Sequence, residues 1–362
     1  MLPWLLFPHV KHLPGLGVLR YITFRAAMAA ATAMVLSLVV GPWVIRLLTR
    51  LKMGQHIREE GPEHHQAKAG TPTMGGILIL LTILVSTLLW CDLSSGVIWV
   101  ALMALLGFGC VGAFDDAQKL LKKQNLGITS WQKMALLTAI ALLIAWLVLH
   151  FGLRGTETSR LSVPFFKKFQ PDLGLFLVPW IWLVVVGTSN AVNLTDGLDG
   201  LAIGGTLAVS VTYAILAYVV GHVKIASYLA VPYVAGGAEL SVFMGAMSGA
   251  CLGFLWFNAH PAEVFMGDTG SLGLGGAIGT VAILVKQEAL LAIAGGLFVI
   301  EAVSVILQIG SYKLRGGKRI FRMAPFHHHM ELGGLAETKV VIRLWITAIV
   351  CCMLALSSLK LR

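Results

Sequence analysis

Charged side chains are scarce in this sequence, and their scarcity excludes a protein built around one water-soluble core. Only 12% of the 362 residues are charged, whereas 57% are hydrophobic, and the mean hydropathy is +0.84. That is far more apolar side chain than a single soluble domain can bury. We therefore expect much of the chain to be solvated by lipid.

Cysteine pairs and a cleavable leader are also lacking. The five cysteines include no CxxC pair and lie mostly in or beside apolar segments, so neither a disulfide framework nor a zinc site is expected. Residues 2–7 are apolar, but no basic leader or small-residue cleavage signal accompanies them, which argues against a removable signal peptide. The net charge of +10 comes from Lys and Arg in short segments between apolar runs. This pattern favours contact with lipid headgroups and no nucleic-acid partner.

The apolar runs have the length of membrane-spanning helices. A span needs about 20 apolar residues as a helix but only about 10 as a barrel strand, and only those two structures satisfy the backbone in hydrocarbon. The runs here are too long for barrel strands, and no long polar segment divides them. The sequence thus predicts an all-α polytopic membrane protein, a single domain over residues 1–362 with about ten transmembrane helices. These are expected at residues 22–46, 75–91, 97–115, 131–151, 174–191, 199–220, 240–257, 271–286, 289–308 and 340–359.

The distribution of basic residues predicts the orientation of the chain in the membrane. The loops after the first, third and ninth spans carry more Lys and Arg than the loops on the other face, although the segment 152–173 on that face is also basic. The positive-inside rule then places those loops in the cytoplasm and both termini in the periplasm. The unusual polar clusters of the sequence all fall on the cytoplasmic face, which predicts active-site loops there.

Two adjacent carboxylates, Asp115 and Asp116, end the third expected span. The helix dipole disfavours an acid at a helix C-terminus by about 0.3–1 kcal/mol. One interpretation is a solvated helix end paired with Lys119, Lys122 and Lys123. The other is a divalent-cation or acid–base site, and these residues alone leave both open.

A second polar cluster, residues 190–200, lies between two apolar spans and contains Asn190, Asn193, Asp196 and Asp199. An Asx turn in which one acid caps the next helix would explain a single carboxylate. Two acids together with two amides also suit oxygen coordination or the recognition of a polar ligand.

A third cluster, residues 265–271, opens the eighth span with Asp268 between two glycines. Glycines let backbone N–H groups approach a phosphate at a helix N-terminus. Because phosphate and carboxylate repel each other, Asp268 would favour a bridging cation. A simple helix cap formed by Asp268 or Thr269 is the alternative.

The basic segment 313–331 contains Arg319, Arg322 and three consecutive histidines at 327–329. Three histidines in a row cannot all face one ion, so a zinc site is not expected. One or two of them could bond phosphate oxygens, or the segment could hold anionic headgroups. Lys68 in a glycine-rich segment also suits a phosphate, or that segment could be only a turn before the start of a helix. Glu301 lies deep in a span, where either a functional acid or a buried structural hydrogen bond would explain it.

Together, acids for a cation and Lys, Arg, His and glycine turns for phosphates predict Mg²⁺-assisted phosphoryl transfer. A secondary transporter would instead place its acids near the bilayer midplane. Since the clusters lie at the ends of spans on one face, the transferase is favoured.

The sequence resembles one known family at several separate motifs. The motifs are KAGTPTMGG at residues 68–76, FDD at 114–116, NAVNLTDGLDGLA at 190–202, FLWFN at 254–258, FMGD at 265–268 and PFHHH at 325–329. Together they resemble the phospho-N-acetylmuramoyl-pentapeptide transferases, a branch of the polyprenyl-phosphate N-acetylhexosamine-1-phosphate transferases. Sister branches that use UDP-N-acetylglucosamine share the Asp-Asp and Gly-Asp motifs, whereas the histidine triplet and the 190–202 run resemble the muramoyl branch.

The resemblance implies a multi-pass enzyme of the bacterial inner membrane that transfers phospho-N-acetylmuramoyl-pentapeptide from UDP-N-acetylmuramoyl-pentapeptide to undecaprenyl phosphate. It implies lipid I and UMP as products, Mg²⁺ as cofactor, and an active site that faces the cytoplasm. A homodimer in the lipid bilayer and inhibition by nucleoside antibiotics are further expectations from the family.

The resemblance also implies roles for individual residues. Asp115, Asp116, Asp268 and His327 are expected to be catalytic, with the three aspartates as Mg²⁺ ligands and Asp115 often assigned as the base. The expected substrate-binding residues are Lys68, Thr73, Lys119, Lys133, Asn190, Asn193, Asp196, Asp199, Asn258, Phe265, Gln308, His328 and His329. Within this set, the uridine-diphosphate pocket would be formed by Lys68, Asp199, Asn258 and Phe265, with Phe265 stacked on uracil.

Overall fold

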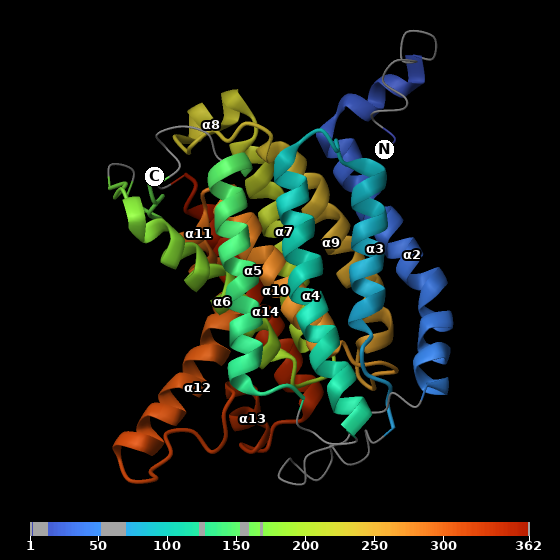
Figure 1. Ribbon diagram of the computed structural model, residues 1–362, viewed down its shortest axis with the longest axis vertical. Coiled ribbons are helices and arrows are strands. Elements are labelled where there is room, and N and C mark those ends of the chain that lie inside the picture. Colours follow the sequence, from blue (N-terminus) through green and yellow to red (C-terminus); the bar gives the residue numbers. More distant parts are fainter. Residues whose placement is uncertain are drawn as a thin grey trace.

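Each long apolar run of the sequence is helical in the computed structural model, which describes residues 2, 14–51, 70–122, 127–152, 159–166 and 169–360 (Figure 1). No strand occurs among these residues, apart from one isolated bridge between Arg160 and Asp172. The long helices are α2 (Ile22–Arg50), α3 (Gly76–Trp90), α4 (Gly96–Lys122), α5 (Ser130–Leu147), α6 (Leu177–Thr195), α7 (Leu201–Val220), α9 (Gly237–Asn258), α10 (Gly267–Leu284), α12 (Gly296–Leu314) and α14 (Glu337–Ser357). The short ones are α8 (Val223–Leu229), α11 (Glu288–Ala294) and α13 (Phe326–Glu331).

The predicted all-α polytopic architecture is confirmed. Among the described residues, eight helices are long and apolar enough to cross a membrane, namely α2, α4, α5, α6, α7, α9, α12 and α14. Two further expected spans, α3 and α10, are helical but do not belong to these eight helices. Helix α3 has only 15 residues, and α10 has 18 residues with six glycines. The number of spans and the side of the termini stay predictions.

Two expected boundaries were wrong. The ninth expected span, 289–308, is divided at Gly295 into α11 and α12. Two adjacent glycines weaken a helix at this point, because glycine has the most conformational freedom to lose. The third span continues to Lys122, so Asp115 and Asp116 lie inside α4 and not at its C-terminus. Residues 117–122 are good helix formers, but they include the polar residues Gln118, Lys119 and Lys122, so hydropathy alone missed them.

Helices α9 and α10 form the centre of the bundle. Every residue from Thr269 to Leu284 in α10 is buried, and α9 is buried along most of its length. Helix α9 packs against α2 and α7, while α10 packs against α4 and α6. Lipid supplies no hydrophobic force between helices, so their association depends on close packing, which small residues at the contacts allow. A Cβ at Gly249 in α9 would lie 1.9 Å from the backbone oxygen of Ala30 in α2.

The helices run between two ends of the bundle. The start of α2 and the end of α14 lie at the upper end in Figure 1, whereas the end of α4 and the short helix α13 lie at the lower end. Helix α12 leans away from the bundle toward that lower end (Figure 1). The lower end therefore carries two of the polar clusters of the sequence, the aspartates near the end of α4 and the histidines of α13.

Replacement of Gly249 by Ala is expected to destabilise the α2–α9 contact. The new methyl group would overlap the backbone of Ala30, and overpacking of this kind costs about 1–3 kcal/mol. The matched control is Gly310→Ala in α12, where nothing lies within 4 Å and helix propensity improves by about 1 kcal/mol. Thermal unfolding in detergent should show a midpoint lowered by at least about 3 °C for Gly249→Ala alone. Equal midpoints for the two variants would contradict this packing.

Candidate active site

Three carboxylates from two helices meet at the lower end of the bundle. Asp115 and Asp116 extend from α4, and Asp268 lies in the first turn of α10. Each offers one oxygen atom, and these atoms all lie within 4.8 Å of one another. Asp115 and Asp116 are buried, and Asp268 is half-buried.

Asp116 caps the N-terminus of α10 from the neighbouring helix. Its carboxylate accepts hydrogen bonds from the backbone N–H groups of Asp268 at 3.2 Å and Thr269 at 2.9 Å, and from the Thr269 hydroxyl at 2.8 Å. The interpretation of Asp268 or Thr269 as the cap was wrong, because the N-cap residue is Met266 and no side chain of α10 caps it. A carboxylate at this position is favoured by the helix dipole.

Glycines permit the close approach of α4 and α10. A Cβ at Gly112 would lie 2.1 Å from the backbone oxygen of Asp268. Gly267 has φ +71°, and a Cβ there would lie 2.7 Å from Oδ2 of Asp116 and 3.0 Å from the hydroxyl oxygen of Thr73. Both positions therefore exclude any side chain, and Thr73 lies beside the carboxylates.

The segment before α3 is held against the segment before α10 by backbone hydrogen bonds. Gly75 N–H donates to Phe265 at 2.8 Å, Gly76 N–H donates to Met266 at 2.9 Å, and Phe265 N–H donates to Pro72 at 2.9 Å. This pairing fixes Thr73 and Phe265 relative to Asp268. Lys68 lies outside the described residues.

Two lysines lie among the carboxylates. The Lys119 Nζ atom is 2.7 Å from Asp115, 3.1 Å from Asp268 and 3.5 Å from Asp116. The Lys133 Nζ atom, from α5, is 2.6 Å from Asp268 and 4.0 Å from Asp115. The Lys119 amine thus stands where a cation shared by the three carboxylates would stand.

The turn after α6 adds an amide and a fourth acid. The Asn193 side-chain amide donates to Asp268 at 2.8 Å and to the Ser271 hydroxyl at 2.8 Å. The pKa of Asp196 is raised to about 8, first by burial and then by the charges of Asp268 and Asp116. Four acids thus face two amines, and the site is short of positive charge. The Asn190 amide instead donates to the Val186 carbonyl oxygen of its own helix at 2.9 Å.

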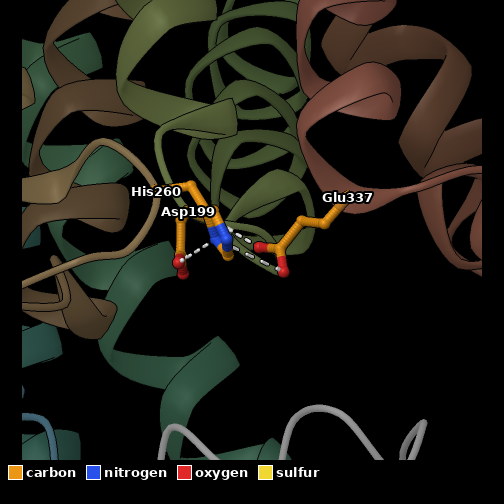
Figure 2. A group of neighbouring side chains, drawn as sticks. All are labelled: Asp199, His260 and Glu337. Carbon is orange, nitrogen blue, oxygen red and sulfur yellow. Dashed lines mark hydrogen bonds and ion pairs between the residues drawn. The ribbon is translucent and has the colours of Figure 1, made fainter.

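A second cluster joins three segments that are distant in the sequence. Asp199 lies before α7, His260 follows α9, and Glu337 begins α14, and Figure 2 shows their side chains directed toward one another. The His260 Nδ1 atom is 3.0 Å from Oδ2 of Asp199 and 3.7 Å from Oε2 of Glu337. Asp199 N–H donates to Glu337 at 3.1 Å, and Ala262 N–H donates to Asp199 at 3.2 Å. The cluster ties the start of α14 to both turns.

The sequence did not predict this cluster. Asp199 does not cap α7, because the N-cap residue is Gly200, with φ +79°, and no side-chain cap hydrogen bond forms there. His260 and Glu337 were missed, since each is a single polar residue next to a span. Only the proximity of His260 to the expected site residue Asn258 could have drawn attention to it.

Asn258 links the two turns of the expected nucleotide pocket. Its buried side chain accepts from Gly200 N–H at 3.2 Å and donates to the Val264 carbonyl oxygen at 2.8 Å. Asp199 therefore lies beside the loop that leads to Phe265, whose side chain is half-buried. Asn258 therefore bonds both the turn that carries Asp199 and the loop that leads to Phe265, and the nucleotide pocket stays a prediction.

His327 is completely buried at the start of α13. Its Nδ1 atom is 3.1 Å from Oε2 of Glu301 in α12. Its other nitrogen lies against the turn after α6, since a Cβ at Gly197 would be 2.3 Å from Nε2. His327 thus contacts the turn that carries Asp196.

Three other expected substrate-binding residues have partners within the segment 315–331. His328 Nδ1 is 2.8 Å from Glu331, and His329 Nδ1 accepts from Arg322 N–H at 3.1 Å. The Gln308 carbonyl oxygen accepts from two backbone N–H groups of the loop, and its amide donates to the Phe321 carbonyl oxygen at 2.9 Å. The side chain of Gln308 therefore holds the loop in place.

A bundle of membrane helices with acids, amines and histidines gathered at one end defines the class of a polytopic membrane transferase. The sequence model of Glycosyl transferase family 4 matches residues 98–286, more than half of the chain. The Phospho-N-acetylmuramoyl-pentapeptide-transferase signature 1 matches residues 68–80.

Curated relatives define the branch. Proteins named phospho-N-acetylmuramoyl-pentapeptide-transferase are 53% identical in Desulfotalea psychrophila over 99% of both chains, and 52% identical in Citrifermentans bemidjiense over both whole chains. The one from Koribacter versatilis is 50% identical, again over both whole chains. The chain therefore belongs to the phospho-N-acetylmuramoyl-pentapeptide-transferase family, as its motifs indicated, and is a membrane transferase of peptidoglycan synthesis.

Replacement of Gly112 by Ala is expected to lower transferase activity by at least about 10-fold. The new methyl group would overlap the Asp268 backbone and push the start of α10 away from Asp115 and Asp116. The control is Gly187→Ala in α6, where nothing lies within 4 Å. Activity in detergent should fall for Gly112→Ala only. Full activity of both variants would show that the spacing of α4 and α10 is not critical.

Proposed function

We propose that the enzyme transfers phospho-N-acetylmuramoyl-pentapeptide from UDP-N-acetylmuramoyl-pentapeptide to undecaprenyl phosphate, releasing UMP and forming lipid I. The observation that carries this proposal is the convergence of Asp115, Asp116 and Asp268 with two lysines at one end of a membrane bundle. The basic loops favour the cytoplasmic face of the inner membrane for that end. A homodimer and sensitivity to nucleoside antibiotics are part of the proposal, on the resemblance alone.

The carboxylate site fits Mg²⁺. Carboxylate oxygens are the protein ligands that Mg²⁺ prefers, and Asp115, Asp116 and Asp268 would hold it. The position of the Lys119 amine near all three carboxylates and the raised pKa of Asp196 support this fit. When bound, Mg²⁺ would supply neutralisation of the charge on the diphosphate.

The remaining residues position the two phosphates. We expect Lys119 and Lys133 to hold phosphate oxygens so that an oxygen of the lipid phosphate attacks the sugar-linked phosphorus in line. A new P–O bond forms there while the bond from that phosphorus to the UMP oxygen breaks. Asp199, Asn258 and Phe265 would bind the nucleoside, with the Phe265 ring stacked on uracil.

Removal of a proton by Asp115 contributes less than the placement of charge. A phosphate monoester has a second pKa of about 6, so the lipid phosphate is mostly dianionic at neutral pH. A base then gains only about 1.4 kcal/mol for each pKa unit of mismatch. We therefore assign Asp115 to the cation and not to general base catalysis.

The nucleotide donor decides between this function and that of a sister transferase. Purified enzyme in detergent, with undecaprenyl phosphate and Mg²⁺, should release UMP from UDP-N-acetylmuramoyl-pentapeptide at least about 100-fold faster than from UDP-N-acetylglucosamine. The reverse preference would assign the chain to another branch. Absence of UMP release from either donor would instead favour a transporter.

The Asp115→Asn variant separates the two roles of that carboxylate. We expect activity to fall at least about 100-fold and to stay low between pH 7 and pH 9.5, because a missing ligand is not replaced by hydroxide. The control is Asp172→Asn, which changes an exposed acid in the loop between α5 and α6 and should keep full activity. Recovery of Asp115→Asn at high pH would show that the general-base assignment is right.

A further inference from the structure

Glu301 is a buried acid in α12, and its carboxylate pairs with the side chain of His327. The side chains of Glu301 and His327 are 0% and 1% exposed. One carboxylate oxygen, Oε2, is 3.1 Å from His327 Nδ1 and also accepts the His327 backbone N–H at 3.3 Å. Glu301 therefore fixes both the imidazole ring and the first turn of α13.

The ring has a defined direction. Oε2 already accepts the His327 backbone N–H, and as an acceptor it pairs with a hydrogen on Nδ1. The other nitrogen, Nε2, is buried and has no hydrogen-bond partner among the described residues. Gly197 leaves room for it, because a Cβ there would be 2.3 Å from Nε2. Nε2 therefore faces the turn that carries Asp196.

Glu301 belongs to a polar stripe on α12. Gln308 and Ser311 follow it by seven and ten residues, which places all three on one face of the helix. Gln308 accepts the N–H groups of Ile320 and Phe321, and the Ser311 hydroxyl donates to the Lys318 carbonyl oxygen at 2.9 Å. The stripe thus fastens the basic and histidine-rich segment to α12 at three points.

We propose that Glu301 is the positioning residue for His327. It holds Nδ1 in the protonated form and directs the lone pair of Nε2 toward the Asp196 turn, where it would accept a hydrogen bond from a hydroxyl or N–H group of the proposed substrates. A carboxylate behind a histidine fixes its tautomer and orientation in the same way in other sites, and loss of such a partner typically costs about 10–100-fold in activity. The role in turnover rests on the proposed function, whereas the pairing itself does not.

Two substitutions of Glu301 separate the hydrogen-bond acceptor from the charge. Glu301→Gln keeps an acceptor for Nδ1, and we expect kcat to fall by less than about 10-fold. Glu301→Leu removes the acceptor, and kcat should fall by about 100-fold while KM for both substrates changes by less than about 3-fold. The matched control is Ser304→Ala, one turn along α12, whose hydroxyl donates to the Glu301 backbone oxygen at 2.7 Å; its kcat should stay within about 2-fold. An unchanged kcat in Glu301→Leu, or an effect on KM alone, would overturn the proposal.

Gly197→Ala tests the same placement from the other side of the ring. The added methyl group would displace Nε2 without a change at Glu301, so kcat should fall as it does in Glu301→Leu. Wild-type kcat in Gly197→Ala would show that the direction of Nε2 is not required.

Solid-state NMR of protein labelled with ¹⁵N-histidine tests the pairing without reference to turnover. The signals of His327 are identified by their loss in His327→Gln. We expect protonated Nδ1 in the wild type and in Ser304→Ala, and a shift toward protonated Nε2 in Glu301→Leu. If the wild type shows unprotonated Nδ1, the proposal fails even when the donor assay supports the proposed function. If the donor assay fails, this spectrum still decides whether Glu301 sets the tautomer.

Discussion

The repulsion among carboxylates at the lower end of the bundle is the constraint on which the site depends. Asp115, Asp116, Asp196 and Asp268 come from three separate parts of the chain and lie close enough for their charges to interact, the first two buried and the last two half-buried. Like charges so placed repel strongly unless cations or N–H donors lie between them. Lys119, Lys133, the Asn193 amide and the N-terminus of α10 supply that compensation. The arrangement exists only because backbone approaches backbone, which the absence of a side chain at Gly112 and Gly267 allows.

The same requirement explains the composition of the central helices. Helix α10 must lie against α4 at its start and against α6 further along, and a Cβ at Gly275 or Gly279 would meet the α6 backbone at 2.7 Å or 3.0 Å. A helix with this many glycines has low intrinsic stability, but burial of every residue from Thr269 to Leu284 among neighbouring helices compensates for the weak propensity. The contacts that pack α10 against α4 and α6 also fix the position of the acids at the lower end.

The sequence predicted the helical class and the acids of the site, because hydropathy and residue chemistry act locally. It did not predict the extent of α4 beyond Asp116, since polar helix formers carry no hydropathy signal. It also missed the break at Gly295, because an average over 20 residues conceals one interrupted turn. The partners of His260, Glu337 and Glu301 depend on segments that meet only in the folded chain, and no spacing within the sequence encodes such a meeting. Glu301 stood out as a buried acid, but both interpretations of it remained open until His327 was found beside it.

Helix α12 leans out of the bundle, and its polar stripe holds the loop and α13 at three points. Its other faces carry exposed apolar side chains such as Ile306 and Leu314, which suit contact with lipid. The helix begins at the glycine pair 295–296, where the backbone bends easily. A pivot at that pair would move α12, α13 and the loop together, because hydrogen bonds join the three. A force that the surrounding lipid exerts on α12 would then reach α13 and the loop as well.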